Sequence, residues 1–281
     1  MRKIALVTDS TSDLTEDVRT LHDIHVIPMK LRFADEEFTD GTLSSEDFYR
    51  RLAEEKVLPK TSQPSPEEFG QLYSRLLEEY QEIISIHISS GLSGTLNAAY
   101  LAKEKLATDS IHVVDSKSIS LGLGLLVMEA ARLIKEGIKI TGILERLAKA
   151  RENLETLFTL NTLEYLQKGG RIGKVNSLAG TILNIKPVIR VGDDGIYHSF
   201  AMARGQDRAI NCIIKAFQRL VAGRKDARLA VAHGAALEVG KYLKEALENA
   251  IQIPVSIFTQ VGPVIGAHTG PGTVGAALLF E

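Results

Sequence analysis

The first half of the chain alternates short apolar runs with segments whose apolar residues recur every three or four positions. The apolar runs predict strands, and the periodic segments predict amphipathic helices. Strands are expected over 3–9, 24–33, 82–88 and 111–116, and helices over 12–23, 44–56, 66–80, 95–106, 119–135 and 141–154. This alternation favours an α/β fold whose first domain, residues 1–150, has a doubly wound, mostly parallel sheet.

The second half has a different order of elements. The segments 186–191 and 195–204 meet at the sequence GDDG (192–195), which favours an antiparallel hairpin. Further strands are expected over 154–160, 227–234, 254–261 and 273–280, and helices over 163–173, 209–221 and 237–251. This order predicts an α+β domain with a mixed or antiparallel sheet over residues 151–281.

Several helix starts carry capping signals. Ser65 stands three residues before Glu68, with a proline directly after the serine, which is the pattern of a capping box. Ser45 is expected to cap the helix over 44–56. Ser12 or Asp13 is expected to open the helix over 12–23, so we interpret the polar segment TDSTSD (8–13) mainly as a helix start.

Composition and charge exclude several classes of protein. Of the 281 residues, 44% are hydrophobic, the mean hydropathy is +0.03 and the net charge is −2, so a general nucleic-acid-binding surface is not expected. The longest apolar stretch, 118–134, is interrupted by Glu129 and Arg132, and no membrane span is expected. We therefore expect a cytoplasmic protein. The single cysteine, Cys212, excludes an intramolecular disulfide and a multi-thiolate zinc site, and we expect no metal.

Three loops of the first half are rich in hydroxyl side chains: 8–13, 60–65 and 89–95. The carboxyl ends of parallel strands meet at one edge of a sheet, where ligands usually bind. Gly94 allows close backbone approach, and the following helix adds positive potential at its first turn. Lys60 is the only cation in these loops, so they suit a singly charged carboxylate better than a triphosphate. Helix capping is the alternative role for the hydroxyls.

The segment 261–275 (VGPVIGAHTGPGTVG) places His268 among glycines. Its GPGTVG matches a dinucleotide-binding pattern, but the few residues that follow leave no room for the required helix and strand. Glycines on both sides leave little packing to explain the histidine, so we expect a loop in which His268 contacts a ligand. Arg171 and Arg204 also neighbour glycines, which indicates either a helix end or a site for a phosphate or an acidic partner.

An alternative function is that of a serine esterase. Residues 91–95 (GLSGT) nearly match the nucleophile elbow G-x-S-x-G between a strand and a helix. Ser93, Asp115 and His268 occur in the order of the α/β-hydrolases. Against this reading, Thr95 replaces the last glycine, and no motif for an oxyanion hole is present.

The ordered motifs TDSTSDL, KTSQPSPEEF, SSGLSGTLNAA, VVDSKSISLGLG, LEYLQKGGRIG, NIKPVI, ARG and HTGPG resemble those of the DegV family over essentially the whole chain. The resemblance implies a non-catalytic, two-domain protein that holds a long-chain fatty acid such as palmitate in a buried tunnel between its domains, with no other cofactor. It also implies, for some members, a separate fatty acid kinase that phosphorylates the bound acid for phospholipid synthesis. A sensor or carrier role without a kinase is the alternative, and lipid exchange implies transient membrane contact.

The resemblance also assigns residues. It places Thr61, Ser93, the Gly94 amide and His268 around the fatty-acid carboxylate. It links Arg171 to the kinase partner and the phosphorylated head group. Neighbouring residues of the head-group loops are Ser62, Thr95 and Gly270, and the second partner-linked arginine is Arg204.

Overall fold

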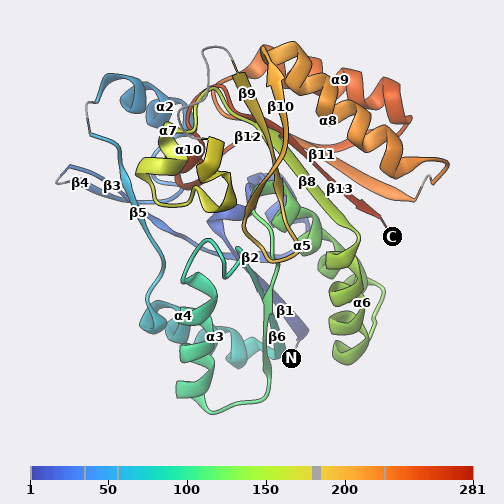
Figure 1. Ribbon diagram of the computed structural model, residues 1–281. Helices are drawn as coiled ribbons and strands as arrows, with labels where there is room; N and C mark the ends of the chain where they lie inside the picture. Colours follow the sequence, from blue (N-terminus) through green and yellow to red (C-terminus); the bar gives the residue numbers. More distant parts are fainter. Residues whose placement is uncertain (1, 35, 56, 179–184, 225, 281) are drawn as a thin grey trace.

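The computed structural model describes residues 2–34, 36–55, 57–178, 185–224 and 226–280. The first half contains a four-stranded sheet with the strand order β2-β1-β6-β7, in which all pairs are parallel (Figure 1). Its strands are β1 (Arg2–Asp9), β2 (Ile24–Ile27), β6 (Tyr80–His87) and β7 (Ile111–Asp115). The predicted parallel sheet is thus confirmed.

Helices cover both faces of this sheet. On one face, α3 (Pro66–Glu79) and α4 (Thr95–Leu106) share an apolar cluster with Val7 and Ile83. On the other face, α5 (Ser120–Lys135) packs in a cluster with Leu6 and Ile84. Because successive residues of a strand point to opposite faces, strands buried on both sides are continuously apolar, as the sequence pattern indicated.

The second half contains a six-stranded sheet with the order β10-β9-β8-β13-β11-β12. Its strands are β8 (Leu154–Thr159), β9 (Ile185–Val191), β10 (Tyr197–Arg204), β11 (Ala227–His233), β12 (Val255–Gln260) and β13 (Val274–Phe280). Only β11 and β12 pair in parallel, so the sheet is mixed, as predicted, and β9 and β10 form the predicted antiparallel hairpin.

Helices also cover both faces of the mixed sheet. The outer face carries α8 (Gln206–Val221) and α9 (Leu237–Ile251) (Figure 1). Helix α5 contacts β11 and β13 on the inner face, and α6 (Ile140–Glu152) packs beside it. Helix α5 therefore lies between the two sheets. A domain boundary near residue 150 remains a prediction.

The predicted strand over 24–33 is wrong in one respect, because it is two strands in different sheets. After β2, Pro28 lacks the N–H that a sheet ladder needs. Strand β3 (Lys30–Phe33) then pairs with β4 (Glu36–Thr39) and β5 (Lys60–Ser62) in a small antiparallel sheet. Strand β5 lies in a segment expected to be a loop, so Thr61 is held by strand pairing.

Two predicted helix starts are wrong. Residues Ser10–Ser12 form a short 3₁₀ turn, and Asp13 has a φ of 52°, so α1 (Glu16–Leu21) begins only after Thr15. Helix α2 (Ser45–Glu54) is capped by Ser44, whose Oγ accepts the Asp47 N–H at 3.0 Å.

The capping box at α3 is confirmed. Ser65 Oγ accepts the Glu68 N–H at 3.2 Å, and the Glu68 carboxylate accepts the Ser65 N–H at 2.7 Å. In the second half, α7 (Glu164–Lys168) is followed by a 3₁₀ turn, Gly173–Leu178.

The segment around His268 is a helix, where a loop was expected. Helix α10 (Pro263–Thr269) begins at a proline, whose fixed φ suits a first helical position. It packs against α2, and Gly266 contacts Phe48 and Tyr49 closely, where a Cβ atom would collide with both rings. None of the helices in the described ranges reaches the length and apolarity that crossing a bilayer requires.

Candidate functional site

A small pocket, here called the polar pocket, brings together four polar side chains from separate parts of the chain. They are Thr61 on β5, Ser93 after β6, Arg171 after α7 and His268 on α10. Apolar residues complete its wall, among them Met29, Ile88, Leu92, Tyr197 and Ile265.

The imidazole of His268 lies between Thr61 and Gly169. Its Nε2 lies 2.8 Å from Thr61 Oγ1, and its buried Nδ1 has no hydrogen-bond partner among the described residues. Gly169 lies against this ring, so that a Cβ atom there would overlap Nδ1. Burial, together with the charge of Arg171, lowers the pKa of His268 to about 4. The ring is therefore neutral at pH 7, and one of its nitrogens carries a proton.

Ser93 stands at the start of α4. Its Oγ lies 2.8 Å from Thr95 Oγ1 and accepts the Thr95 N–H at 3.3 Å. Gly94 precedes the helix, and the side chain of Gln63 lies so close that a Cβ atom at Gly94 would overlap it. The predicted polar loops 60–65 and 89–95 thus meet at this point. The backbone N–H groups in the first turn of α4 contribute positive potential near Ser93.

Arg171 is exposed at the mouth of the polar pocket. Its Nη1 donates to the Gly169 carbonyl at 2.7 Å, and its Nε donates to the Leu92 carbonyl at 3.3 Å. No carboxylate in the described ranges forms an ion pair with it. Two backbone carbonyls therefore hold a cation beside the pocket, which favours an anionic ligand.

The remaining predicted residues do not line the pocket, and Arg204 lies at the other end of β10 from the lining residue Tyr197. Ser62 is exposed on β5, and Thr95 contacts the pocket residues Ser93 and Met29. Gly270 ends α10 with a φ of 74°, and a Cβ atom there would overlap the Tyr165 ring. Arg204 is exposed at the end of β10. Sequence reasoning did not identify the apolar wall, because its residues have the same pattern as ordinary core positions.

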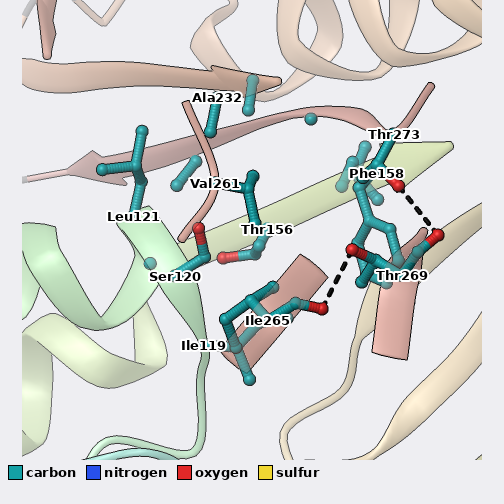
Figure 2. A pocket seen from close by; sticks show the side chains of 15 residues that line it. Ile119, Ser120, Leu121, Thr156, Phe158, Ala232, Val261, Ile265, Thr269 and Thr273 are labelled. Carbon is teal, nitrogen blue, oxygen red and sulfur yellow. Dashed lines mark hydrogen bonds between the residues drawn. The ribbon is translucent and has the colours of Figure 1, made fainter. Parts of the chain in front are cut away.

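A second space, here called the apolar cavity, lies between α5 and the mixed sheet. About 410 Å³ there is free of protein atoms, part of it open to solvent, compared with about 390 Å³ in the polar pocket. Its wall includes Leu121 on α5, Phe158 on β8, Ala232 on β11, Val261 after β12 and Ile265 on α10 (Figure 2). Ile265 also lines the polar pocket, so the two spaces adjoin at this side chain.

Two of the four hydroxyl side chains in the wall of the apolar cavity are committed to backbone oxygens. Thr269 Oγ1 donates to the Ile265 carbonyl at 3.1 Å, and Thr273 Oγ1 donates to the carbonyls of Thr269 and Gly270 at 3.0 and 2.9 Å (Figure 2). Most of the other lining side chains are apolar: Ile119, Leu121, Leu157, Phe158, Ala232, Val261, Ile265, Ala276 and Ala277. The cavity therefore suits an aliphatic chain.

The described residues do not form the relay that an esterase needs. Ser93 Oγ bonds to Thr95, whereas His268 Nε2 bonds to Thr61. Asp115, the expected acid, bonds to Ser90 and to Lys117. A nucleophile needs a base within hydrogen-bond reach, and this geometry supplies none to Ser93.

These features define a class of protein: a mixed α/β protein with a parallel and a mixed sheet, in which a polar pocket adjoins an apolar cavity. The family model described as "Uncharacterised protein, DegV family" matches residues 3–281. The chain belongs to the DegV family.

Relatives of known sequence or structure share the whole length. A DegV domain-containing protein of Clostridium acetobutylicum is 37% identical, covering 99% of both chains. A fatty-acid-binding DegV protein of Thermus thermophilus aligns with a TM-score of 0.93 and 35% identity, covering 99% of this chain and 100% of that one. The fatty-acid-binding DegV of Bacillus subtilis aligns with a TM-score of 0.91 and 31% identity, covering both chains completely.

Proposed function

We propose that this protein binds a long-chain fatty acid, with the carboxylate in the polar pocket and the tail in the apolar cavity. The observation that carries the proposal is the position of Ile265, which lines both spaces. A fatty acid has the same division into a polar end and an aliphatic chain. The Thermus and Bacillus relatives are described as binding fatty acids, which supports the same ligand class for this chain.

The polar pocket offers the carboxylate several donors. The Ser93 hydroxyl and the Gly94 amide donate to its oxygens, and Arg171 supplies the opposite charge. His268 is neutral at pH 7 because its pKa is lowered to about 4, so it and Thr61 carry one proton each. One of these protons forms the bond between the two residues, and the other is donated to the carboxylate. These contacts are needed because a buried, unpaired carboxylate is strongly unfavourable.

The tail supplies most of the affinity. A chain of about 14 methylenes gains roughly 11 kcal/mol gross on burial, at about 0.8 kcal/mol each. Loss of translational freedom and ordering of the chain offset several kcal/mol. The remainder is compatible with nanomolar binding, so we expect the ligand, for example palmitate, to copurify.

The bound carboxylate is proposed to react with a separate kinase. The exposed Arg171 at the mouth supports an accessible head group. The kinase transfers the terminal phosphoryl group of ATP to a carboxylate oxygen, which leaves ADP and an acyl phosphate for phospholipid synthesis. In this proposal the DegV protein is a cytoplasmic, non-catalytic subunit that meets the membrane transiently to exchange lipid. A sensor or carrier without a kinase would use the same binding residues.

Mass spectrometry of the denatured, purified protein tests the binding. We expect a stoichiometric C14–C18 fatty acid in the extract. A lipid-free extract, followed by failure of the protein to take up any added fatty acid, would contradict the proposal. A pull-down with the bound lipid retained separates kinase partnership from a carrier role.

A further inference from the structure

One pair of hydroxyls in the wall of the apolar cavity differs from the others. Thr156 Oγ1, on β8, lies 3.3 Å from the Oγ of Ser118, which precedes α5. Both residues are buried, with 8% and 2% of their surface exposed. Thr156 lines the apolar cavity (Figure 2), and both residues line a second cavity that contains Lys117 and Arg151. The pair therefore separates an apolar space from a polar one.

This pair has one donor proton without an acceptor. Each hydroxyl carries one proton, and a single bond between the two oxygens uses only one of them. No other acceptor for the second proton is found in the described ranges. By contrast, Ser120 donates to Asp13, and Thr269 and Thr273 donate to backbone carbonyls. A buried donor that lacks an acceptor is unfavourable, and a ligand oxygen can correct it.

Gly122 preserves the space that the pair occupies. It lies in the first turn of α5, and a Cβ atom there would overlap both Ser118 Oγ and Thr156 Oγ1. Glycine is unfavourable inside a helix relative to alanine, so its presence requires a packing reason. The two hydroxyls provide that reason, because they occupy the volume that a side chain would fill.

The pair lies away from the carboxylate end of the site. Helix α10, which carries His268 of the polar pocket, leads into β13, whose first residue Val274 pairs with Thr159 at the carboxyl end of β8. Thr156 lies three residues before Thr159, about 10 Å back along the strand. A fatty acid held by its carboxylate in the polar pocket would therefore meet Thr156 along its aliphatic chain.

The charges behind the pair balance. The second cavity is lined by Lys117 and Arg151 and by Glu152 and Asp193. Lys117 is paired with Asp115 at 2.9 Å. This environment has no excess of cations for a second carboxylate, so it favours a neutral oxygen group.

We propose that the Ser118–Thr156 pair binds a neutral oxygen on the acyl chain, so that this protein accepts hydroxy or oxo fatty acids as well as plain ones. The inference rests on the fatty-acid-binding function proposed above. An oxygen substituent on the acyl carbon that lies beside the Ser118–Thr156 pair is therefore tolerated. At other acyl carbons the same substituent is buried against apolar carbon.

A positional series of ligands tests this inference. Delipidated protein is titrated calorimetrically with stearic acid and with its 8-, 10-, 12-, 14- and 18-hydroxy derivatives. We expect one isomer to bind within about threefold of stearic acid, and the others about tenfold or more weakly, because their hydroxyl is buried without a partner. Thr156→Val preserves the shape of the side chain, and it should raise the ratio of the stearic acid affinity to the affinity of the favoured isomer about tenfold. Thr156→Ser keeps the low penalty.

Thr273→Val is the matched control, because the Thr273 hydroxyl lines the same cavity but is committed to backbone carbonyls. This variant should leave the ratios between the affinities of the hydroxystearic acid isomers unchanged. Equal penalties for all isomers in the wild-type protein, or an unchanged ratio in Thr156→Val, would overturn the inference. The wild-type series decides this even if a variant does not fold. Failure of stearic acid itself to bind would instead contradict the proposed function.

Discussion

Thr61 Oγ1 and His268 Nε2 lie 2.8 Å apart although 207 residues separate them in the chain. The bond joins strand β5 to helix α10, and it closes one side of the polar pocket. The pair keeps one proton that it can donate to a ligand oxygen. The local stability of β5 and α10 is therefore coupled to ligand binding in the polar pocket.

Removing a pocket hydroxyl should weaken fatty-acid binding. Thr61→Val and Ser93→Ala each remove one donor to the carboxylate, so we expect a loss of about 1–3 kcal/mol in binding free energy. Calorimetric titration of delipidated protein with palmitic acid measures it. Ser62→Ala is the control, since Ser62 is exposed and lies outside the pocket wall. Labelling of Ser93 by a fluorophosphonate would instead favour the esterase alternative.

Replacing Gly169 should weaken fatty-acid binding, because the absence of a side chain there leaves room for the His268 imidazole. In Gly169→Ala, the added Cβ atom would overlap His268 Nδ1 and lie 2.9 Å from the Tyr165 carbonyl oxygen, so the imidazole ring must move. We expect fatty-acid binding to weaken by about as much as in His268→Ala, that is, by about 1–3 kcal/mol.

A double-mutant cycle checks this explanation. If the alanine acts through the ring, adding Gly169→Ala to His268→Ala should change the affinity little more. Fully additive losses would show that Gly169 acts by another route.

The sequence predicted those parts of the fold that depend on local signals. Helix α4 follows a buried strand and has the bounds expected, and the Ser65–Glu68 capping box is formed. The errors occur where tertiary contacts decide. Ser12 or Asp13 was expected to open a helix, but Ser12 lies in a 3₁₀ turn, and Asp13 adopts a left-handed conformation and accepts from Ser120 and the Gly262 N–H.

The polar residues of the site could be proposed from sequence, but their arrangement could not. Thr61, Ser93 and His268 carry a recognisable pattern of hydroxyls and glycines around them. The wall residues Ile88 and Ile265 look like any core isoleucine, because only the way that distant elements pack leaves a cavity beside them. The place of Arg171 at the mouth follows from the same long-range packing.

The two arginines should have different effects when their charge is reversed. Arg171 lines the polar pocket, so Arg171→Glu places a carboxylate beside the ligand's carboxylate and should weaken palmitate binding more than tenfold. Arg204 is exposed outside the pocket wall, so Arg204→Glu should leave palmitate affinity unchanged.

Phosphoryl transfer with an added fatty acid kinase separates partner contact from ligand binding. At saturating lipid, Arg204→Glu should lower the rate if Arg204 contacts the kinase. An unchanged rate for this variant would remove Arg204 from the proposed partner surface. Arg204→Lys, which keeps the charge, should retain most of the rate.

Asp13 should make stability depend on pH between about 4 and about 7. Burial raises the pKa of Asp13 from 3.8 to about 7, because the charged form is desolvated although Ser120 and the Gly262 N–H donate to it. The folded state therefore holds this proton more tightly than the unfolded chain, and the stabilisation is lost as the pH rises from about 4 to about 7, by up to about 1.4 kcal/mol per pH unit. The contribution of His268 to stability changes with pH in the opposite direction, since its pKa is lowered to about 4.

Denaturant unfolding of the wild-type protein and Asp13→Asn at matched pH values isolates the Asp13 contribution to the free energy of unfolding. Asp40→Asn is the comparison, because burial raises the pKa of Asp40 only to about 6, so its contribution should end at lower pH. If the unfolding free energies of the wild-type protein and Asp13→Asn run parallel over the whole range, the titration of Asp13 is not coupled to folding.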